Sequence, residues 1–348
     1  MKIKRNKGGE LSASLREQLP FYGLNLAKFV AIKRNMAFNV QVSLALGCLI
    51  EASKVDAYTY LASGARIIST QIGRYSTIGP FCNVGLEGHA LNALSTNNAI
   101  NGSTVFYDFN PKLTQKRDST WLKQNDGEFL RPLTVGHGVY LEPWVIVPKG
   151  GLTIGHGAYI KANTVVTKDV PSYAIVANGP RGSQVIGYRY SDEIIADLLA
   201  LQWWQYDLPA LLSQGVNIPF FDIHAFIALM RQVEAAHFPK LTEQWRYLAY
   251  HTEDEVVLYD VTSDVAMLTL FPKLNNKQKI GLVKQEITRQ EQYQIACLHQ
   301  NTNSALAQDL GGLKSQEQGG IYRGALNGVE GITLLSAPGQ NYESESKS

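Results

Sequence analysis

Branched apolar residues recur every six positions in two blocks of the chain. The first block is Leu49, Val55, Leu61 and Ile67, followed after one dropped residue by Ile72, Ile78 and Val84; the second is Val135, Leu141 and Val147, then Ile154, Ile160 and Val166. A period of six suits neither an amphipathic helix nor an alternating strand. It is typical of a parallel β-helix, in which each short strand turns one aliphatic side chain inward and the stacked coils bury a continuous apolar column.

Between the two blocks, residues 86–132 have no period. The segment is rich in Asn, Ser, Thr and Gly, with aromatic residues set among them. A long aperiodic insertion in a rigid solenoid is typically a functional loop, because the scaffold holds its root while the loop is free to vary. We therefore expect this insertion to carry chemistry.

The pattern divides the chain into four parts. These are an N-terminal helical segment (1–48), a β-helix with its insertion (49–190), capping helices (191–238) and a C-terminal extension (239–348) whose end is poorly ordered. The extension combines strands with helix, as in an α+β region. The fold class is thus mainly β, a hexapeptide-repeat solenoid with flanking helices.

Local signals refine these parts. A helix is expected over residues 10–35, where Ser14 and Glu17 have capping-box spacing. After the repeats, Ser191 is a candidate N-cap for a helix that ends at a Trp-Trp pair, and a second helix is expected over residues 222–234. Further on, EVVLYDVTSDVAMLTLF predicts two strands around Thr262 and Ser263.

Composition narrows the classes of function. The net charge of +2 does not mark the chain as a polyanion binder, so no nucleic-acid partner is expected. Three cysteines without metal-ligand spacing argue against a disulfide framework or a structural zinc site. No apolar run approaches the ~20 residues of a spanning helix, and no apolar segment follows the basic start. We expect a cytoplasmic protein without a transmembrane segment.

The repeats resemble those of the hexapeptide-repeat acyltransferases, and more narrowly the xenobiotic acetyltransferase branch. Three features carry the resemblance over about residues 50–213. They are the closing run AYIKANTVVTKDVPSYAIVANGP, a histidine in the insertion followed six residues later by Ser-Thr, and a helix with a Trp-Trp pair. The resemblance implies a left-handed β-helix that assembles as a homotrimer, with active sites between subunits and acetyl-CoA as the acyl donor.

The histidine of the insertion is His89, and the Ser-Thr pair is Ser95 and Thr96. Imidazole has a reference pKa near ~6.5, so it is neutral near pH 7 and still able to take a proton. The resemblance implies that His89 deprotonates the acceptor hydroxyl, which attacks acetyl-CoA directly. Ser95, Thr96, Tyr107 and Trp121 are the candidate acceptor-binding residues.

For coenzyme A, the resemblance implies contacts from the closing run. Ala162 and Thr167 would bind the pantetheine arm through their backbone, and Lys168 would lie near a phosphate. Two corners depart from the family pattern, because Glu142 and Lys161 stand where glycine is usual. A basic residue that often follows Val-Ile is also absent, and we expect Arg181 or Arg189 to replace it.

The leading hypothesis is an O-acetyltransferase acting on a carbohydrate hydroxyl, such as that of a bacterial surface polysaccharide or its precursor. The alternatives are acetylation of an antibiotic such as chloramphenicol or a streptogramin, and a solenoid that only scaffolds assembly. A metalloenzyme of the carbonic anhydrase kind would need three converging histidines. His137 and His156 instead occupy corners, where we expect exposed turn residues, and Cys82 is expected to be structural.

Overall fold

The protein is described by a computed structural model over residues 9–86, 132–148, 151–232, 237–253, 255–266, 294–299, 321–323 and 332–336. Within these ranges no helix is both long and apolar enough to cross a membrane. Of the insertion, residues 86–132, these ranges include only the first and the last residue.

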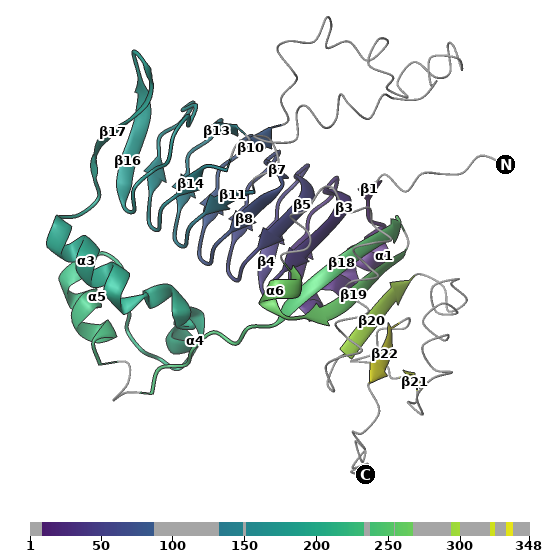
Figure 1. The fold of residues 1–348 in the computed structure, drawn as a ribbon. Coiled ribbons are helices and arrows are strands. Elements are labelled where there is room, and N and C mark those ends of the chain that lie inside the picture. Colours follow the sequence, from purple (N-terminus) through teal and green to yellow (C-terminus); the bar gives the residue numbers. More distant parts are fainter. Residues whose placement is uncertain are drawn as a thin grey trace, which may run out of the picture.

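The predicted parallel β-helix is confirmed (Figure 1). Its coils have three faces. The first face consists of β2 (Leu24–Leu26), β4 (Val42–Leu44), β6 (Tyr60–Leu61), β9 (Thr77–Ile78), β12 (Tyr140–Leu141), β15 (Tyr159–Ile160) and β16 (Ala174–Gly179). The second consists of the first halves of β3 (Ala31–Phe38) and β5 (Leu49–Val55), then β7 (Arg66–Ile68), β10 (Asn83–Leu86) and β13 (Ile146–Pro148). The third consists of the second halves of β3 and β5, then β8 (Thr70–Ile72), β11 (Leu133–Val135) and β14 (Thr153–Ile154).

The hexad residues form the interior of the solenoid. Val55, Ile72, Val135 and Ile154 stack along the third face, and all are at most 2% exposed. The series begins differently from the prediction. At the start of β5, Ile50 is fully buried, whereas Leu49, the residue predicted to face inward, is half-buried. Each coil thus buries one aliphatic residue per face, and these stacked columns form the continuous apolar core.

The dropped residue seen in the sequence is a structural feature of the early coils. Ile50, Ile67 and Val84 pair in register and are each 17 residues apart. The shortening occurs at the corner between the second and third faces, where Ala52 and Ser69 turn the chain with φ of 47° and 46°. We call this the insertion corner, because in the next coil the chain between Leu86 and Leu133 stands where the earlier coils have one corner residue. In a later coil, Thr167–Asp169 occupy this same corner of the solenoid.

The N-terminal segment is not the helical region that was predicted. Among residues 9–48, helix is confined to α1 (Ala13–Gln18) and a 3-10 helix over Leu19–Tyr22, preceded by the short β1 (Gly9–Glu10), and residues 24–48 already form solenoid coils. The capping-box prediction also fails, because Ser12 is the N-cap of α1. In β2, Leu24 and Leu26 are buried and Asn25 between them is exposed, which is the alternating pattern of a strand. The six-residue spacing did not reveal this strand.

A C-terminal hairpin covers the first coil. In β18 (Trp245–Thr252), Leu248 pairs with Met36 of β3, and β19 (Glu255–Val261) pairs with β18. The first of the two strands predicted around Thr262 and Ser263 is confirmed as β19, whereas Ser263–Ala266 form a short helix, α6, and the second predicted strand lies outside the described residues. Farther along lie β20 (Gln294–His299), β21 (Ile321–Arg323) and β22 (Ile332–Ser336), within the part expected to be poorly ordered at its end. The hairpin pairs the edge strand that the first coil would otherwise leave open.

The last coil continues into a hairpin and then into helices. β17 (Gly182–Tyr188) returns antiparallel along β16. It is followed by α3 (Asp192–Leu201), a 3-10 helix over Trp203–Gln205, α4 (Leu208–Ser213) and α5 (Ile223–Met230), which lie along one side of the solenoid (Figure 1). Ser191 and Asp222 are the N-caps of α3 and α5, and the Asp222 carboxylate accepts from the amide of Ala225 at 3.0 Å. Both predicted helices are confirmed, although α5 ends at Met230.

Candidate active site

The insertion leaves and re-enters the solenoid at one rigid corner. Val84 in β10 and Leu133 in β11 are at most 1% exposed, and the Leu133 amide donates to the Ser69 carbonyl at 3.2 Å. Gly85 has φ +82°, and a β-carbon there would lie 1.8 Å from the Ile68 carbonyl oxygen. Only glycine fits this close approach, so Gly85 allows β10 to lie against Ile68 directly before the insertion begins.

The insertion residues themselves lie outside the described part of the chain. These are the candidate base His89 and the candidate acceptor-binding residues Ser95, Thr96, Tyr107 and Trp121. Their assignment stays a prediction. What the structure gives is the point of departure, since His89 follows Leu86, the last residue of β10, by three residues.

Thr167 lies on the same corner as that point of departure. Leu86 pairs with Pro148 in the next coil. Val165 bridges to Ile146, so Thr167, two residues on, continues the column through Pro148. Neighbouring strands are ~4.8 Å apart, which separates Leu86 and Thr167 by about 10 Å along the solenoid axis. Leu86, where the insertion begins, and Thr167, the candidate coenzyme contact, thus lie at one edge of the solenoid.

The hairpin of β16 and β17 brings further polar groups to this edge. The Thr167 amide donates to the Ser183 hydroxyl at 3.1 Å, and Asn178 accepts from the Val165 amide at 3.0 Å. Arg181 is exposed at the turn of the hairpin, two residues before Ser183. Lys168 follows Thr167 and is also exposed. The structure therefore gathers Thr167, Lys168 and the Arg181 turn at one end of the second face.

Ala162 lies on a different corner, between the first and second faces. Its amide donates to Glu142 at 2.7 Å, and the same carboxylate accepts from Lys161 at 2.8 Å and from the Tyr159 hydroxyl. These donors, Lys161 first, lower the pKa of Glu142 to about 2. The two departures from the family pattern thus form one ion pair, which uses the backbone group predicted for the pantetheine arm. The opposite charges of Glu142 and Lys161, both at positions where the family usually has glycine, are the feature of the sequence from which this ion pair could have been predicted.

Arg189 is not brought together with the other candidate coenzyme contacts. It follows β17 on the return toward the corner between the third and first faces. There Nη1 donates to the Gly157 carbonyl at 2.8 Å, and the guanidinium lies 5.8 Å from the Tyr173 ring and 5.4 Å from the Tyr190 ring. Of the two basic residues considered for the phosphate, Arg181 is the one near Thr167.

The two corner histidines are half-buried, not exposed as predicted. His137 accepts from the Arg74 amide at 2.8 Å, and His156 accepts from the His137 amide at 3.1 Å, each through Nδ1. The rings stack 5.0 Å apart, and Trp204 stacks on both. The indole comes from the segment after α3, which sequence spacing does not place here. We call this the histidine corner, and its rings fasten the helices to the solenoid.

Neutral imidazoles are required at this corner, since each Nδ1 accepts a hydrogen bond. Burial, the neighbouring His156 and Arg74 lower the pKa of His137 to about 4, against an opposing effect of Asp56. Burial also lowers the pKa of His156. A lowered histidine pKa contributes stability above the unfolded-state pKa of ~6.5, and that contribution falls as pH falls toward 4.

We therefore expect acid to weaken the fold through this corner. Between pH 7 and pH 4 the free energy of unfolding should fall by up to about 3 kcal/mol on account of His137. His137→Asn, which keeps an acceptor but does not titrate, should show a correspondingly smaller fall. Urea unfolding followed by tryptophan fluorescence at both pH values measures the difference. Identical pH dependence in the two proteins would contradict this role.

Cys82 is structural, as predicted from the repeat. It is buried, its thiol donates to the Glu142 carbonyl at 3.1 Å, and burial raises its pKa to about 11. A thiol of this kind is not ionised near pH 7 and is a poor nucleophile. Among the described residues there is also no group of three or more His, Cys, Asp or Glu arranged to hold a metal ion.

Comparison with known proteins gives a short sequence match. A stretch of 59 residues is 42% identical to a virginiamycin A acetyltransferase from Staphylococcus aureus, and it covers 17% of this chain and 25% of that relative. The chain thus spans about a quarter of the length of the curated relative it matches. No protein-family model matches the chain. The resemblance to hexapeptide-repeat acyltransferases is confirmed for this stretch.

Two solved structures show distant similarity. A hexapeptide-repeat acetyltransferase from Vibrio cholerae is 17% identical, with a TM-score of 0.31, over 43% of this chain and 72% of that chain. PerB from Caulobacter crescentus, solved with CoA and GDP-perosamine, is 15% identical, with a TM-score of 0.32, over 50% of this chain and 65% of that chain. These values are too low to transfer a function.

Proposed function

We propose that the protein is an acetyl-CoA-dependent O-acetyltransferase that acts on a carbohydrate hydroxyl, with His89 as general base. The proposal includes a cytoplasmic homotrimer whose active sites lie between subunits. A bacterial surface polysaccharide or its precursor is the acceptor class we propose. The observation that supports the proposal is the shared corner, because Leu86, where the insertion that contains His89 begins, and the Thr167–Lys168 segment lie at one edge of the solenoid.

The reaction is a direct transfer. His89 takes the proton of the acceptor hydroxyl as its oxygen forms a bond to the acetyl carbonyl carbon. The tetrahedral intermediate then collapses, the carbon–sulfur bond breaks, and the thiolate of CoA leaves and takes up a proton. No acyl-enzyme is needed, which agrees with the inert, buried thiol of Cys82. Ser95 and Thr96, with Tyr107 and Trp121, are proposed to hold the acceptor.

The first test measures thiol release from acetyl-CoA by the full chain. We expect release to depend on a carbohydrate acceptor from a panel of surface oligosaccharides, with chloramphenicol and virginiamycin as alternative acceptors. Mass spectrometry of the product should show one added acetyl group on the sugar. If the protein binds acetyl-CoA but releases no thiol with any acceptor of the panel, the result would contradict acetyl transfer and favour the hypothesis of a non-catalytic scaffold.

Lys168 is proposed to contact a phosphate of CoA. Comparing the binding of CoA and of 3′-dephospho-CoA tests this contact. Lys168→Ala should weaken CoA binding by about three- to tenfold, the size expected for one exposed charged hydrogen bond. The effect should shrink as ionic strength rises. If the contact is to the 3′-phosphate, 3′-dephospho-CoA should bind the two proteins equally in calorimetry. Equal affinity of wild type and variant for CoA at low salt would contradict the contact.

Antibiotic acetylation is the second candidate, because the curated relative that matches a stretch of the chain is a virginiamycin A acetyltransferase. In that case release of thiol would depend on virginiamycin and not on sugars. The same acceptor panel therefore separates the two candidates, and both require His89.

A further inference from the structure

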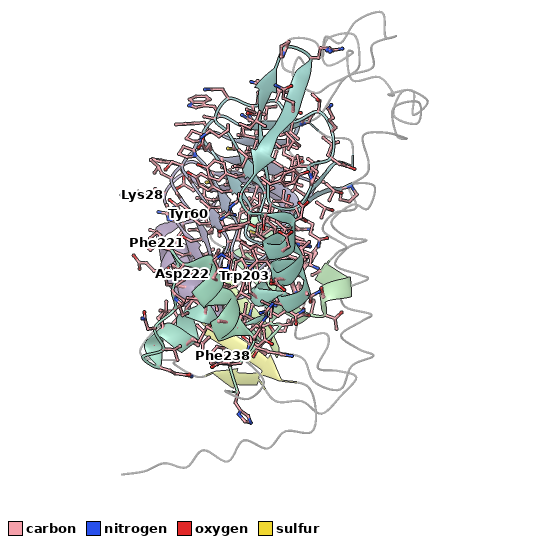
Figure 2. The ribbon with its side chains drawn as sticks, turned by 90° about the vertical axis from the view of Figure 1, so that its left-hand side faces the viewer. Lys28, Tyr60, Trp203, Phe221, Asp222 and Phe238 are labelled. Atoms are coloured by element: carbon pink, nitrogen blue, oxygen red, sulfur yellow. The ribbon has the colours of Figure 1, made fainter. Side chains whose placement is uncertain are left out.

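An open cavity of about 410 Å³ lies between the solenoid and the helices α3–α5. Tyr75 and Tyr173 line it from the solenoid, and Leu198, Trp203 and Phe226 line it from the helices. Figure 2 shows Trp203 within the helical group and Phe221 at its outer edge. The volume falls within the ~300–1,000 Å³ range of small-molecule sites. This cavity adjoins the histidine corner and not the insertion corner, so it is separate from the proposed site of acetyl transfer.

The aromatic walls of the cavity are fixed in place. The Tyr75 hydroxyl donates to the Tyr206 carbonyl at 2.7 Å and accepts from the Leu208 amide at 3.2 Å. Trp203 donates from Nε1 to the Tyr173 hydroxyl at 3.1 Å, and its ring lies 5.4 Å from that of Tyr75. The polar tips of these side chains are thus satisfied within the protein. Their rings present a preformed apolar surface to a ligand.

Arg189 is the charged residue of the cavity lining. Its guanidinium has five N–H donors, and one of them bonds the Gly157 carbonyl. The Tyr173 and Tyr190 rings hold the planar group by cation–π contact. Among the described residues no carboxylate lies within ion-pair distance of it, unlike Arg74 and Arg231, which pair with aspartates. Arg189 is exposed to solvent, so a cation is held in position at the open side of an apolar cavity with no ion-pair partner among the described residues.

The entrance of the cavity is also apolar. Leu212 and Phe220 belong to the lining and are 46% and 60% exposed. Exposed apolar residues around a concave site are typical of surfaces that bind apolar groups. Together with Arg189, they suit a ligand that has an apolar body and one negative charge, and they disfavour a cationic ligand.

We propose that this cavity binds a small amphiphilic anion, with a single acyl or alkyl chain against Tyr75, Trp203 and Phe226 and a carboxylate or phosphate head on Arg189. The inference goes beyond the proposed acetyl transfer. It depends on neither His89 nor coenzyme A, so the two proposals fail or stand separately.

Calorimetry on the full chain with three probes tests the proposal: decanoate, decyl phosphate and decanol. We expect the better of the two anions to bind at one site per chain and at least about tenfold more tightly than decanol, the factor expected for one charge-assisted hydrogen bond. The tighter of the two anions identifies the head group. Leu212→Trp, which narrows the entrance, should weaken all three probes.

Two arginine variants separate the charge at the cavity from charge elsewhere. Arg189→Gln should weaken the anion by about tenfold and leave decanol unchanged. The control Arg66→Gln, an exposed arginine on β7, should change neither. Arg189→Lys keeps the charge, and we expect it to bind the anion with an affinity between those of wild type and Arg189→Gln; binding as weak as that of Arg189→Gln would mean that the Gly157 contact, and not the charge, holds the site. Circular dichroism of each variant verifies folding.

Several results would overturn the proposal. These are the absence of binding by both anions, equal affinity for decanol and the better anion, anion binding that Arg189→Gln leaves intact, or a stoichiometry well above one per chain. The last result would indicate adsorption to exposed apolar surface instead of a defined site.

Discussion

His89→Ala should lower the rate of acetyl transfer by ~10²- to 10⁴-fold, the usual contribution of a positioned general base. The reason is chemical: without the imidazole, a neutral acceptor hydroxyl must lose its proton to water as it attacks. Because the substitution lies in the insertion, beyond the buried root at Val84 and Leu133, we expect the fold and the affinity for CoA to be unchanged. Thiol release gives the rate, and calorimetry gives the affinity.

A second histidine provides the matched control for that experiment. His224 on α5 is exposed and lies outside the residues proposed for catalysis or CoA binding. His224→Ala should keep the wild-type rate, which excludes a general effect of removing an imidazole. If His89→Ala retains most of its rate, or if it loses CoA binding along with the rate, His89 is not the base.

The rate of the wild-type protein should also depend on pH through this residue. A base must be unprotonated to act, so kcat/KM should rise with pH through the pKa of His89 and then level off. The acid instability expected from His137 has a different signature, because it lowers the amount of folded protein. Measuring activity after return to pH 7 distinguishes reversible titration from loss of the fold.

The interior of the solenoid was predictable from the sequence because its determinant is local. One aliphatic residue per strand repeats at fixed spacing, and the insertion interrupts that spacing at a definite place, between Val84 and Leu133. The start of the series was misplaced by one residue, at Leu49 instead of Ile50, because both are aliphatic and only the short corner at Ala52 decides which one faces inward. Spacing alone does not report that corner.

Elements that depend on distant partners were not predictable in this way. The hairpin of β18 and β19 completes the sheet at β3, more than 200 residues earlier in the chain, and no local pattern encodes that pairing. Likewise, the repeat shows that His137 and His156 occupy corners, but Trp204 must arrive from beyond α3 to bury them. The candidate site residues Ala162, Thr167 and Lys168 lie at corners, but which corner each one occupies could not be read from the six-residue spacing, because it depends on the number of residues in every preceding coil.

Gly85 links the fold to the proposed chemistry, and its substitution should be the most damaging single change in the described solenoid root. Gly85→Ala forces a β-carbon to within 1.8 Å of the Ile68 carbonyl oxygen at a residue with φ +82°. Left-handed strain costs ~1–2 kcal/mol and overpacking another ~1–3 kcal/mol, so we expect a loss of about 2–5 kcal/mol in the free energy of unfolding. Urea unfolding measures this loss.

Gly47 offers a control with the same backbone conformation but no crowding. Its φ is +70°, and a β-carbon there meets nothing within 4 Å. Gly47→Ala should therefore cost only the ~1–2 kcal/mol of left-handed strain. If the two variants lose equal stability, the close approach at Ile68 does not constrain the chain.

The same pair of variants tests whether the root positions His89. His89 lies four residues after Gly85, and a displacement of ~1 Å at a reacting group can lower a rate about 10²-fold. Under conditions where both variants remain folded, Gly85→Ala should therefore lose acetyl transfer far beyond its loss of folded protein, while Gly47→Ala should not. Wild-type turnover by folded Gly85→Ala would mean that the insertion positions its histidine independently of the solenoid, and the shared corner would then no longer support the proposed function.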